Sequence, residues 1–289
     1  MPFLQRKLNL NPFLTKAMNN TFNINRFGLL LKRQWLDFGK IYLISLVVVI
    51  GVIIGFYAYS APLPSKANNF DYDSNLDMRF RYPLFLILGF LFISIVASSY
   101  FSLLGQKSRA ILELMTPAST FEKFLTGVFY TAILSLLSYL ILFYITDLAF
   151  VKYINAHLAE FKINGDSKKA IQPVESIAAQ IFYDVNYRAF LRSFLAIPFL
   201  VTSVFLLGSI YFNRFHYIKT AVSVMVFSGI ATYLVVKAAG LLTEGMVNVG
   251  PGKHQSDKDM AFLLIFLITA LLTLIFWAIA YVRLKEKEV

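Results

Sequence analysis

Few residues in this sequence could carry out chemistry, and they lie far apart. The chain has no cysteine, which excludes thiol catalysis, disulfide scaffolds and Cys-ligated metal centres. Its three histidines, His157, His216 and His254, are too widely spaced for an HExxH-type zinc motif. The sequence also contains neither a GxSxG nucleophile motif nor a P-loop. We therefore predict a protein that is not itself an enzyme and that uses no cofactor and no metal ion.

The composition excludes a soluble enzyme domain. Of the 289 residues, 58% are hydrophobic and only 15% are charged, whereas an average soluble domain is roughly 45–50% apolar and about 25% charged. So large an apolar share cannot be buried in one core beneath a wettable surface. The formal net charge of +11 is compatible with a nucleic-acid partner or with a membrane protein that is basic on one side.

Long apolar stretches predict the elements that must position any functional residue. Six of them can cross about 30 Å of hydrocarbon as helices, and they lie at 41–60, 83–104, 124–150, 194–212, 221–242 and 260–282. The predicted fold is therefore an all-α integral membrane protein with six transmembrane helices. Its parts are an N-terminal segment 1–40, a transmembrane domain 41–282 and a tail 283–289.

The distribution of charge predicts the orientation of these spans. Six spans put both termini on one side, which also holds the loops 105–123 and 213–219 and carries 15 basic and five acidic residues. The other side carries 12 basic and 11 acidic residues. By the positive-inside rule, the basic side and both termini are cytoplasmic. The basic excess then reflects topology, and we expect no nucleic-acid partner.

An amphipathic helix is predicted over residues 25–40, just before the first span. Its apolar stripe consists of Phe27, Leu30, Leu31, Trp35 and Phe38, and its opposite side carries Arg26, Arg33, Asp37 and Lys40. Asn25 is a candidate cap for its first turn. An apolar stripe with a basic opposite side is typical of a helix lying in the membrane interface, which is our prediction. The alternative is a cytoplasmic extension of the first span.

The loop between the second and third spans carries the clearest local signals. Pro117 disfavours helical geometry at Thr116 and predicts a break there. Ser119 followed by Glu122 forms a capping box that should open the third helical segment. Residues 106–115 should then form a short helix. Its apolar side would contact either the bilayer surface or a partner protein. The alternative is that the helix is simply the end of an ordinary helical hairpin.

The spans themselves offer little polar chemistry. No ionisable residue lies in the middle of a predicted span, and we expect Asp147 and Lys237, near the outer ends of two spans, to reach the interface. Gly51 and Gly55 form a GxxxG pattern that allows close helix packing, within the chain or with a second copy. Outside the spans, helical spacing of apolar residues predicts a helix within 174–188.

The loop sequence 108–130, SRAILELMTPASTFEKFLTGVFY, carries a family resemblance. Together with six spans and the amphipathic segment 23–40, it resembles the permease subunits of ABC-2 type transporters. Members often have a charged helix, then a leucine-rich turn with Thr-Pro and Ser, then a lysine entering the third span. These places are taken here by Glu113, Leu114, Thr116, Pro117, Ser119, Glu122 and Lys123.

The resemblance implies a function and a set of partners. The loop would be a coupling helix that docks on a separate ABC ATPase, with contact residues Arg109, Glu113, Met115, Pro117, Ser119, Glu122 and Lys123. Two permeases, as a homodimer or a heterodimer, would work with two ATPases as an exporter in the bacterial plasma (inner) membrane. The substrate is not indicated. The alternative function is a membrane scaffold or assembly protein without transport.

Overall fold

The regular elements of the computed structural model are helices. It describes residues 22–62, 76–102, 116, 118–161, 172–183, 195–243 and 254–288. Within these ranges lie α2 (Ile24–Ser60), α3 (Arg81–Tyr100), α5 (Thr120–Val128), the π-helix η3 (Phe129–Leu134), α6 (Ser135–Ala156), the 3₁₀ turn η4 (Leu158–Glu160), α7 (Ile177–Tyr183), α9 (Ile197–Tyr211), α10 (His216–Thr243) and α11 (His254–Glu288). The predicted all-helical class is confirmed.

Five helical segments are long and apolar enough to cross a membrane. They are Ile24–Ser60, Arg81–Tyr100, Thr120–Ala156, His216–Leu234 and Phe262–Lys287, and they fit a multi-pass membrane protein. The predicted fourth span corresponds to α9, which has 15 residues. At 1.5 Å per residue α9 is about 22 Å long, shorter than the roughly 30 Å of hydrocarbon. The count of six spans therefore stays a prediction.

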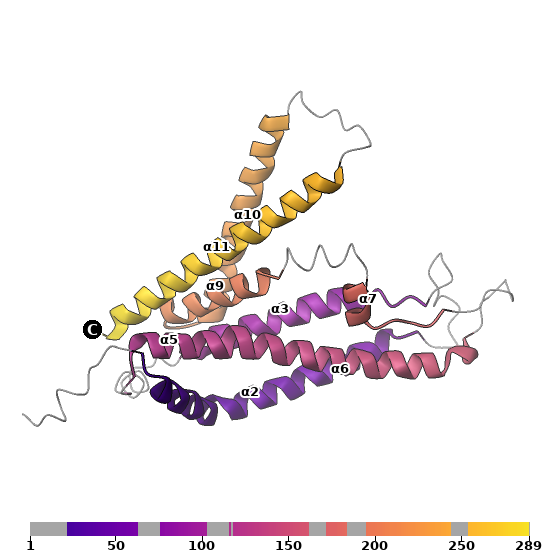
Figure 1. The fold of residues 1–289 in the computed structure, drawn as a ribbon, viewed down its shortest axis with the longest axis horizontal. Helices are drawn as coiled ribbons and strands as arrows, with labels where there is room; N and C mark the ends of the chain where they lie inside the picture. Colours follow the sequence, from indigo (N-terminus) through magenta and orange to yellow (C-terminus); the bar gives the residue numbers. More distant parts are fainter. Residues whose placement is uncertain are drawn as a thin grey trace, which may run out of the picture.

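The helices form a lengthwise bundle with one divergent pair. In Figure 1, α2, α3 and the continuous segment α5–η3–α6 lie along one another, and α9 lies between α3 and α11. The beginnings of α2 and α5 and the end of α11 lie at the same end of the bundle (Figure 1). We call this the α5 end and the opposite one the α7 end. The helix α10 and the first half of α11 stand apart from the bundle (Figure 1), and α10 is exposed along most of its length.

Two apolar clusters hold the bundle together. The first joins α2, α3 and α6 through buried residues that include Ile53, Ile93 and Tyr139. The second joins the end of α3 to α5, η3, α9 and α11 through residues that include Leu206 and Ala280. Because α9 contributes mainly to the second cluster, it connects the divergent pair to the rest of the molecule.

The amphipathic segment is continuous with the first span. α2 runs from Ile24 to Ser60 without a break at Gly39, as in the alternative of a helical extension. Its cap is Asn23, whose side-chain oxygen accepts the backbone N–H of Asn25 at 2.9 Å. The prediction of Asn25 as the cap was thus wrong by two residues, because either asparagine can supply the acceptor oxygen that a helix start requires.

The third span contains a π-helical turn that no sequence signal predicted. Between α5 and α6, Phe129–Leu134 are wound as a π-helix. Hydroxyl groups accompany the change in winding: Thr131 donates to the carbonyl oxygen of Gly127 at 2.8 Å, and Ser135 donates to that of Thr131. Such turns often occur at functional sites, and this one faces the N-terminal part of α2 through Tyr130.

Close contact between α9 and α10 makes Gly208 sensitive to substitution. A Cβ at this position would lie 1.9 Å from Oγ1 of Thr220 and 2.7 Å from its Cγ2. The Thr220 hydroxyl also donates a hydrogen bond to the carbonyl oxygen of His216 at 2.7 Å, which restricts its movement. We expect Gly208→Ala to lower the free energy of unfolding by about 1–3 kcal/mol through overpacking, measured by equilibrium unfolding in mild detergent.

Gly229 on α10 provides the matched control for Gly208. Within the described chain, a Cβ there would meet no atom within 4 Å. Gly229→Ala should leave stability unchanged or raise it by up to about 1 kcal/mol, because alanine favours the helix over glycine. Equal effects of the two substitutions would contradict a close α9–α10 contact.

Candidate functional site

The predicted capping box is present at the start of the third helical segment. The N–H of Glu122 donates to Oγ of Ser119 at 3.2 Å, and the N–H of Ser119 donates to Oε2 of Glu122 at 2.9 Å. The two residues thereby satisfy two backbone donors at the beginning of α5. This fixes the point at which the predicted coupling loop joins the bundle.

Glu122 also ties α5 to the beginning of α2. Its Oε1 accepts the backbone N–H of Asn23 at 2.8 Å and Nη2 of Arg26 at 3.0 Å, and its side chain is fully buried. A second tie lies nearby, where Nη1 of Arg33 donates to Oγ1 of Thr116. The structure thus brings together the end of the loop and the amphipathic segment, two features that the sequence places about 90 residues apart.

The apolar stripe of the amphipathic segment faces the bundle. Leu30 is buried, and Leu31 and Phe38 pack against the two apolar clusters. Trp35 is 41% exposed and stacks on Tyr130 of the π-helix, with ring centroids 6.5 Å apart and an interplanar angle of 19°. The Tyr130 hydroxyl donates to the carbonyl oxygen of Leu31 at 2.8 Å. Much of the stripe is therefore used in protein packing.

The remaining predicted site residues divide into three groups. Arg109, Glu113, Met115 and Pro117 lie outside the described residues. Phe27 is half-buried, and Lys123 is buried at the α5 end. Gly51 and Gly55 are exposed, and a Cβ on either would meet nothing within 4 Å. Within the described chain their face is therefore uncovered, and packing against a second copy stays a prediction.

At the α7 end, Asp147 is buried in an ion pair, and its position relative to the interface stays a prediction. Its side chain is 1% exposed and pairs with Arg81, which is 2% exposed, at 3.1 Å between Oδ1 and Nη1. Arg81, at the first position of α3, compensates the charge of Asp147 inside the bundle. Lys237 is exposed, with Nζ 5.9 Å from the ring centroid of Tyr233.

The Arg81–Asp147 pair links four elements. The Tyr57 hydroxyl at the end of α2 donates to Oδ1 of Asp147 at 2.6 Å, and the N–H of Ile177 in α7 donates to Oδ2 at 2.8 Å. Nε and Nη1 of Arg81 donate to the carbonyl oxygens of Met78 at 3.2 Å and Glu175 at 3.0 Å. Sequence reasoning missed Arg81, since the residue precedes the predicted span and nothing in the sequence names its partner.

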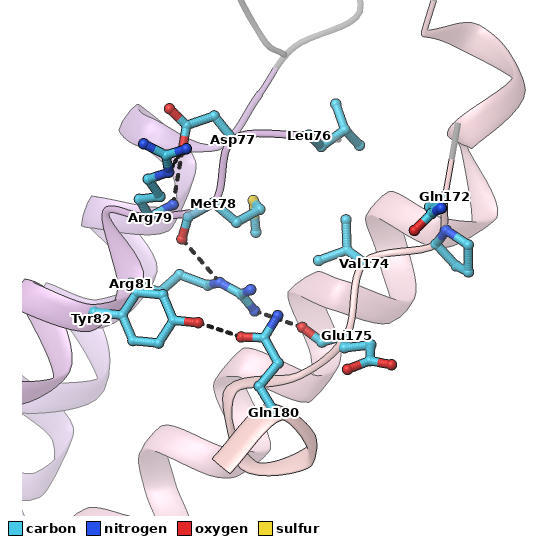
Figure 2. Close-up of a pocket in the computed structure, with 11 residues that line it drawn as sticks. Leu76, Asp77, Met78, Arg79, Arg81, Tyr82, Gln172, Val174, Glu175 and Gln180 are labelled. Atoms are coloured by element: carbon cyan, nitrogen blue, oxygen red, sulfur yellow. Dashed lines mark hydrogen bonds and ion pairs between the residues drawn. The ribbon is translucent and has the colours of Figure 1, made fainter. Parts of the chain in front are cut away.

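A cavity of about 410 Å³ opens beside this pair. Figure 2 shows the guanidinium of Arg81 at its centre, with the Tyr82–Gln180 hydrogen bond below and Met78 and Val174 as apolar walls. Asp77 and Arg79 lie on one side of it and Glu175 on the other (Figure 2). The volume lies within the range of about 300–1,000 Å³ usual for ligand pockets.

Neither a cluster of metal ligands among the described residues nor a known relative indicates what the α5 end and the α7 end do. Within the described ranges, no three His, Asp or Glu side chains come together as metal ligands. The comparison with known proteins gives no further guide: no family model, no curated protein and no solved structure matches the chain.

Proposed function

We propose that the chain is the membrane-spanning permease subunit of an ATP-driven exporter of the ABC-2 type. In this proposal the loop 105–123 docks on a separate ATPase at the cytoplasmic surface of the bacterial plasma membrane. Two permease chains work with two ATPases. The chain itself hydrolyses no ATP.

One observation carries the proposal: the end of the loop is attached to two helices at once. Glu122, in the first turn of α5, binds Asn23 and Arg26 at the start of α2, while Thr116 is bound by Arg33. A displacement of the loop by an ATPase would therefore be passed to α2 and to the segment α5–η3–α6. Both of these segments are of membrane-spanning length.

The π-helix offers a place where such a displacement could be absorbed. It lies directly after α5 and is bound to α2 by the hydrogen bond from Tyr130 to Leu31 and by stacking on Trp35. A π-turn and an α-turn differ in winding, so a local change between them alters the rotation of α6 relative to α5. This supports a permease in which the third span moves.

Charge reversal in the loop tests the proposal. The chain is expected to stimulate ATP hydrolysis by its partner. Arg109→Glu or Glu113→Lys should reduce that activity to the partner's basal level, because the docking surface of the ATPase would repel the altered loop. The measurement is ATP hydrolysis by the co-purified complex in vesicles. Size-exclusion chromatography of each variant checks that the chain remains folded.

Lys152→Glu is the matched control, since Lys152 is an exposed residue near the end of α6, away from the loop. It should leave the stimulated ATPase activity unchanged. A chain that purifies in mild detergent without any ATPase, or loop variants that behave like Lys152→Glu, would contradict the permease function and favour a membrane scaffold.

A further inference from the structure

We propose that the cavity at the α7 end binds a zwitterionic headgroup that combines a phosphate with a primary ammonium, as in phosphoethanolamine. The phosphate would lie against Arg81 and Gln180, and the ammonium near the carboxylate of Glu175. This site goes beyond the proposed transport function and does not depend on the ATPase partner.

The base of the cavity presents hydrogen-bond donors. Arg81 is almost fully buried, and its Nε and both N–H groups of Nη1 are used by Met78, Asp147 and Glu175. Nη2 makes no hydrogen bond within the described chain, yet it is not among the buried unpaired atoms, so it faces the cavity. Guanidinium N–H groups placed in this way bind phosphate oxygens well.

Gln180 adds a second donor at the base. Its Oε1 accepts the hydroxyl of Tyr82, which leaves its amide nitrogen as a donor. Figure 2 shows this amide and the Arg81 guanidinium on the same side of the cavity. Two nitrogen groups with two N–H donors each match an acceptor that has several oxygen atoms.

The charges of the lining favour a ligand without net charge. Arg79 and Arg81 are balanced by Asp77 and Glu175, and Asp147 lies behind Arg81. A plain anion would therefore add unbalanced negative charge next to three carboxylates. A zwitterion adds no net charge, and its ammonium would find the carboxylate of Glu175 on the cavity wall.

The position of the cavity points to a lipid as the source of the headgroup. Arg81 is the first residue of α3, and α3 is one of the segments of membrane-spanning length. A helix of 20 residues extends about 30 Å, the thickness of the hydrocarbon layer. Residues at its first turn consequently lie at the level of lipid headgroups.

Native mass spectrometry of the chain in mild detergent tests the site. Short-chain phosphatidylethanolamine, phosphatidylcholine and phosphatidylglycerol are supplied at equal concentration, and the lipid-bound fraction is measured. We expect phosphatidylethanolamine to be retained best. Glu175→Gln should lower its retention by about tenfold by removing a charge-assisted hydrogen bond. This substitution should leave Arg81 in place, because Arg81 donates its hydrogen bond to the backbone oxygen of Glu175 and not to the carboxylate.

Two further variants separate the two halves of the site. Gln180→Leu should lower the retention of phosphatidylethanolamine and phosphatidylcholine together, since both carry the phosphate. Glu160→Gln, an exposed acid of η4 that does not line the cavity, is the matched control and should change nothing.

The outcomes are distinct. Equal or better retention of phosphatidylglycerol, or no effect of Glu175→Gln, would overturn the zwitterionic site. Displacement of the lipid by millimolar free phosphoethanolamine would support the site and assign it to a soluble ligand. Retention of the lipid under the same conditions would support the site and assign it to the membrane.

Discussion

Replacing Asp147 by alanine is expected to lower the free energy of unfolding by about 3–5 kcal/mol, the usual cost of removing one partner of a buried ion pair. The substitution leaves Arg81 charged and buried, and it also removes the acceptor for the Tyr57 hydroxyl and the Ile177 N–H. Equilibrium unfolding in mild detergent, followed by circular dichroism, measures the loss.

A double substitution and a surface substitution provide the controls for Asp147. Arg81→Leu combined with Asp147→Leu should recover much of the loss, because no uncompensated charge stays buried. Arg79→Gln should change stability by less than about 1 kcal/mol, since its pair with Asp77 is half-exposed at 4.0 Å. If Asp147→Ala behaved like Arg79→Gln, the ion pair would not stabilise the bundle.

Replacing Glu122 by alanine is expected to detach the beginning of α2 from α5. The carboxylate accepts three hydrogen bonds, from Asn23, Arg26 and Ser119. Hydrogen bonds to charged groups contribute about 1.5–3 kcal/mol each, although Arg26 is 31% exposed and contributes less. Hydrogen exchange measured by mass spectrometry should show faster exchange over the first turns of α2 while α6 stays protected.

Glu286 near the end of α11 provides a matched control for Glu122. It pairs with Arg283 at 2.6 Å, but both side chains are about half exposed. Glu286→Ala should therefore leave exchange in α2 unchanged and alter stability by less than about 1 kcal/mol. Faster exchange in α2 with both variants, or with neither, would contradict a specific tether through Glu122. The tether is also the link on which the proposed coupling depends.

Much of the helical architecture could be predicted from the sequence, because long apolar stretches have few alternatives in a membrane. α2 ends at Ser60, where the first span was predicted to end, and α7 lies inside the segment 174–188 where a helix was expected. The shortness of α9 and the π-helix could not be foreseen. Local periodicity reports neither the point at which a helix ends nor a change in its winding, such as the one at Tyr130.

The candidate sites were predictable only where the signal was local. The capping box of Ser119 and Glu122 follows from a four-residue pattern, and it is confirmed. The bonds from Glu122 to α2, and the pairing of Arg81 with Asp147, join residues 66 or more positions apart. A single sequence contains no information on such pairs, so the burial of Asp147 against Arg81 was not predicted.

The short α9 has a consequence for the surrounding lipid. Hydrocarbon about 30 Å thick exceeds the roughly 22 Å length of α9 by about 8 Å. For α9 to cross beside the much longer α11, acyl chains next to it must compress or polar groups must enter the hydrocarbon layer. An apolar pocket of about 260 Å³ at the first turns of α9, lined by Phe199, Phe266 and Trp277 among others, marks where chain ends would fill the difference. In the proposed six-span arrangement, the protein would impose a hydrophobic mismatch beside α9 and prefer shorter lipid chains there.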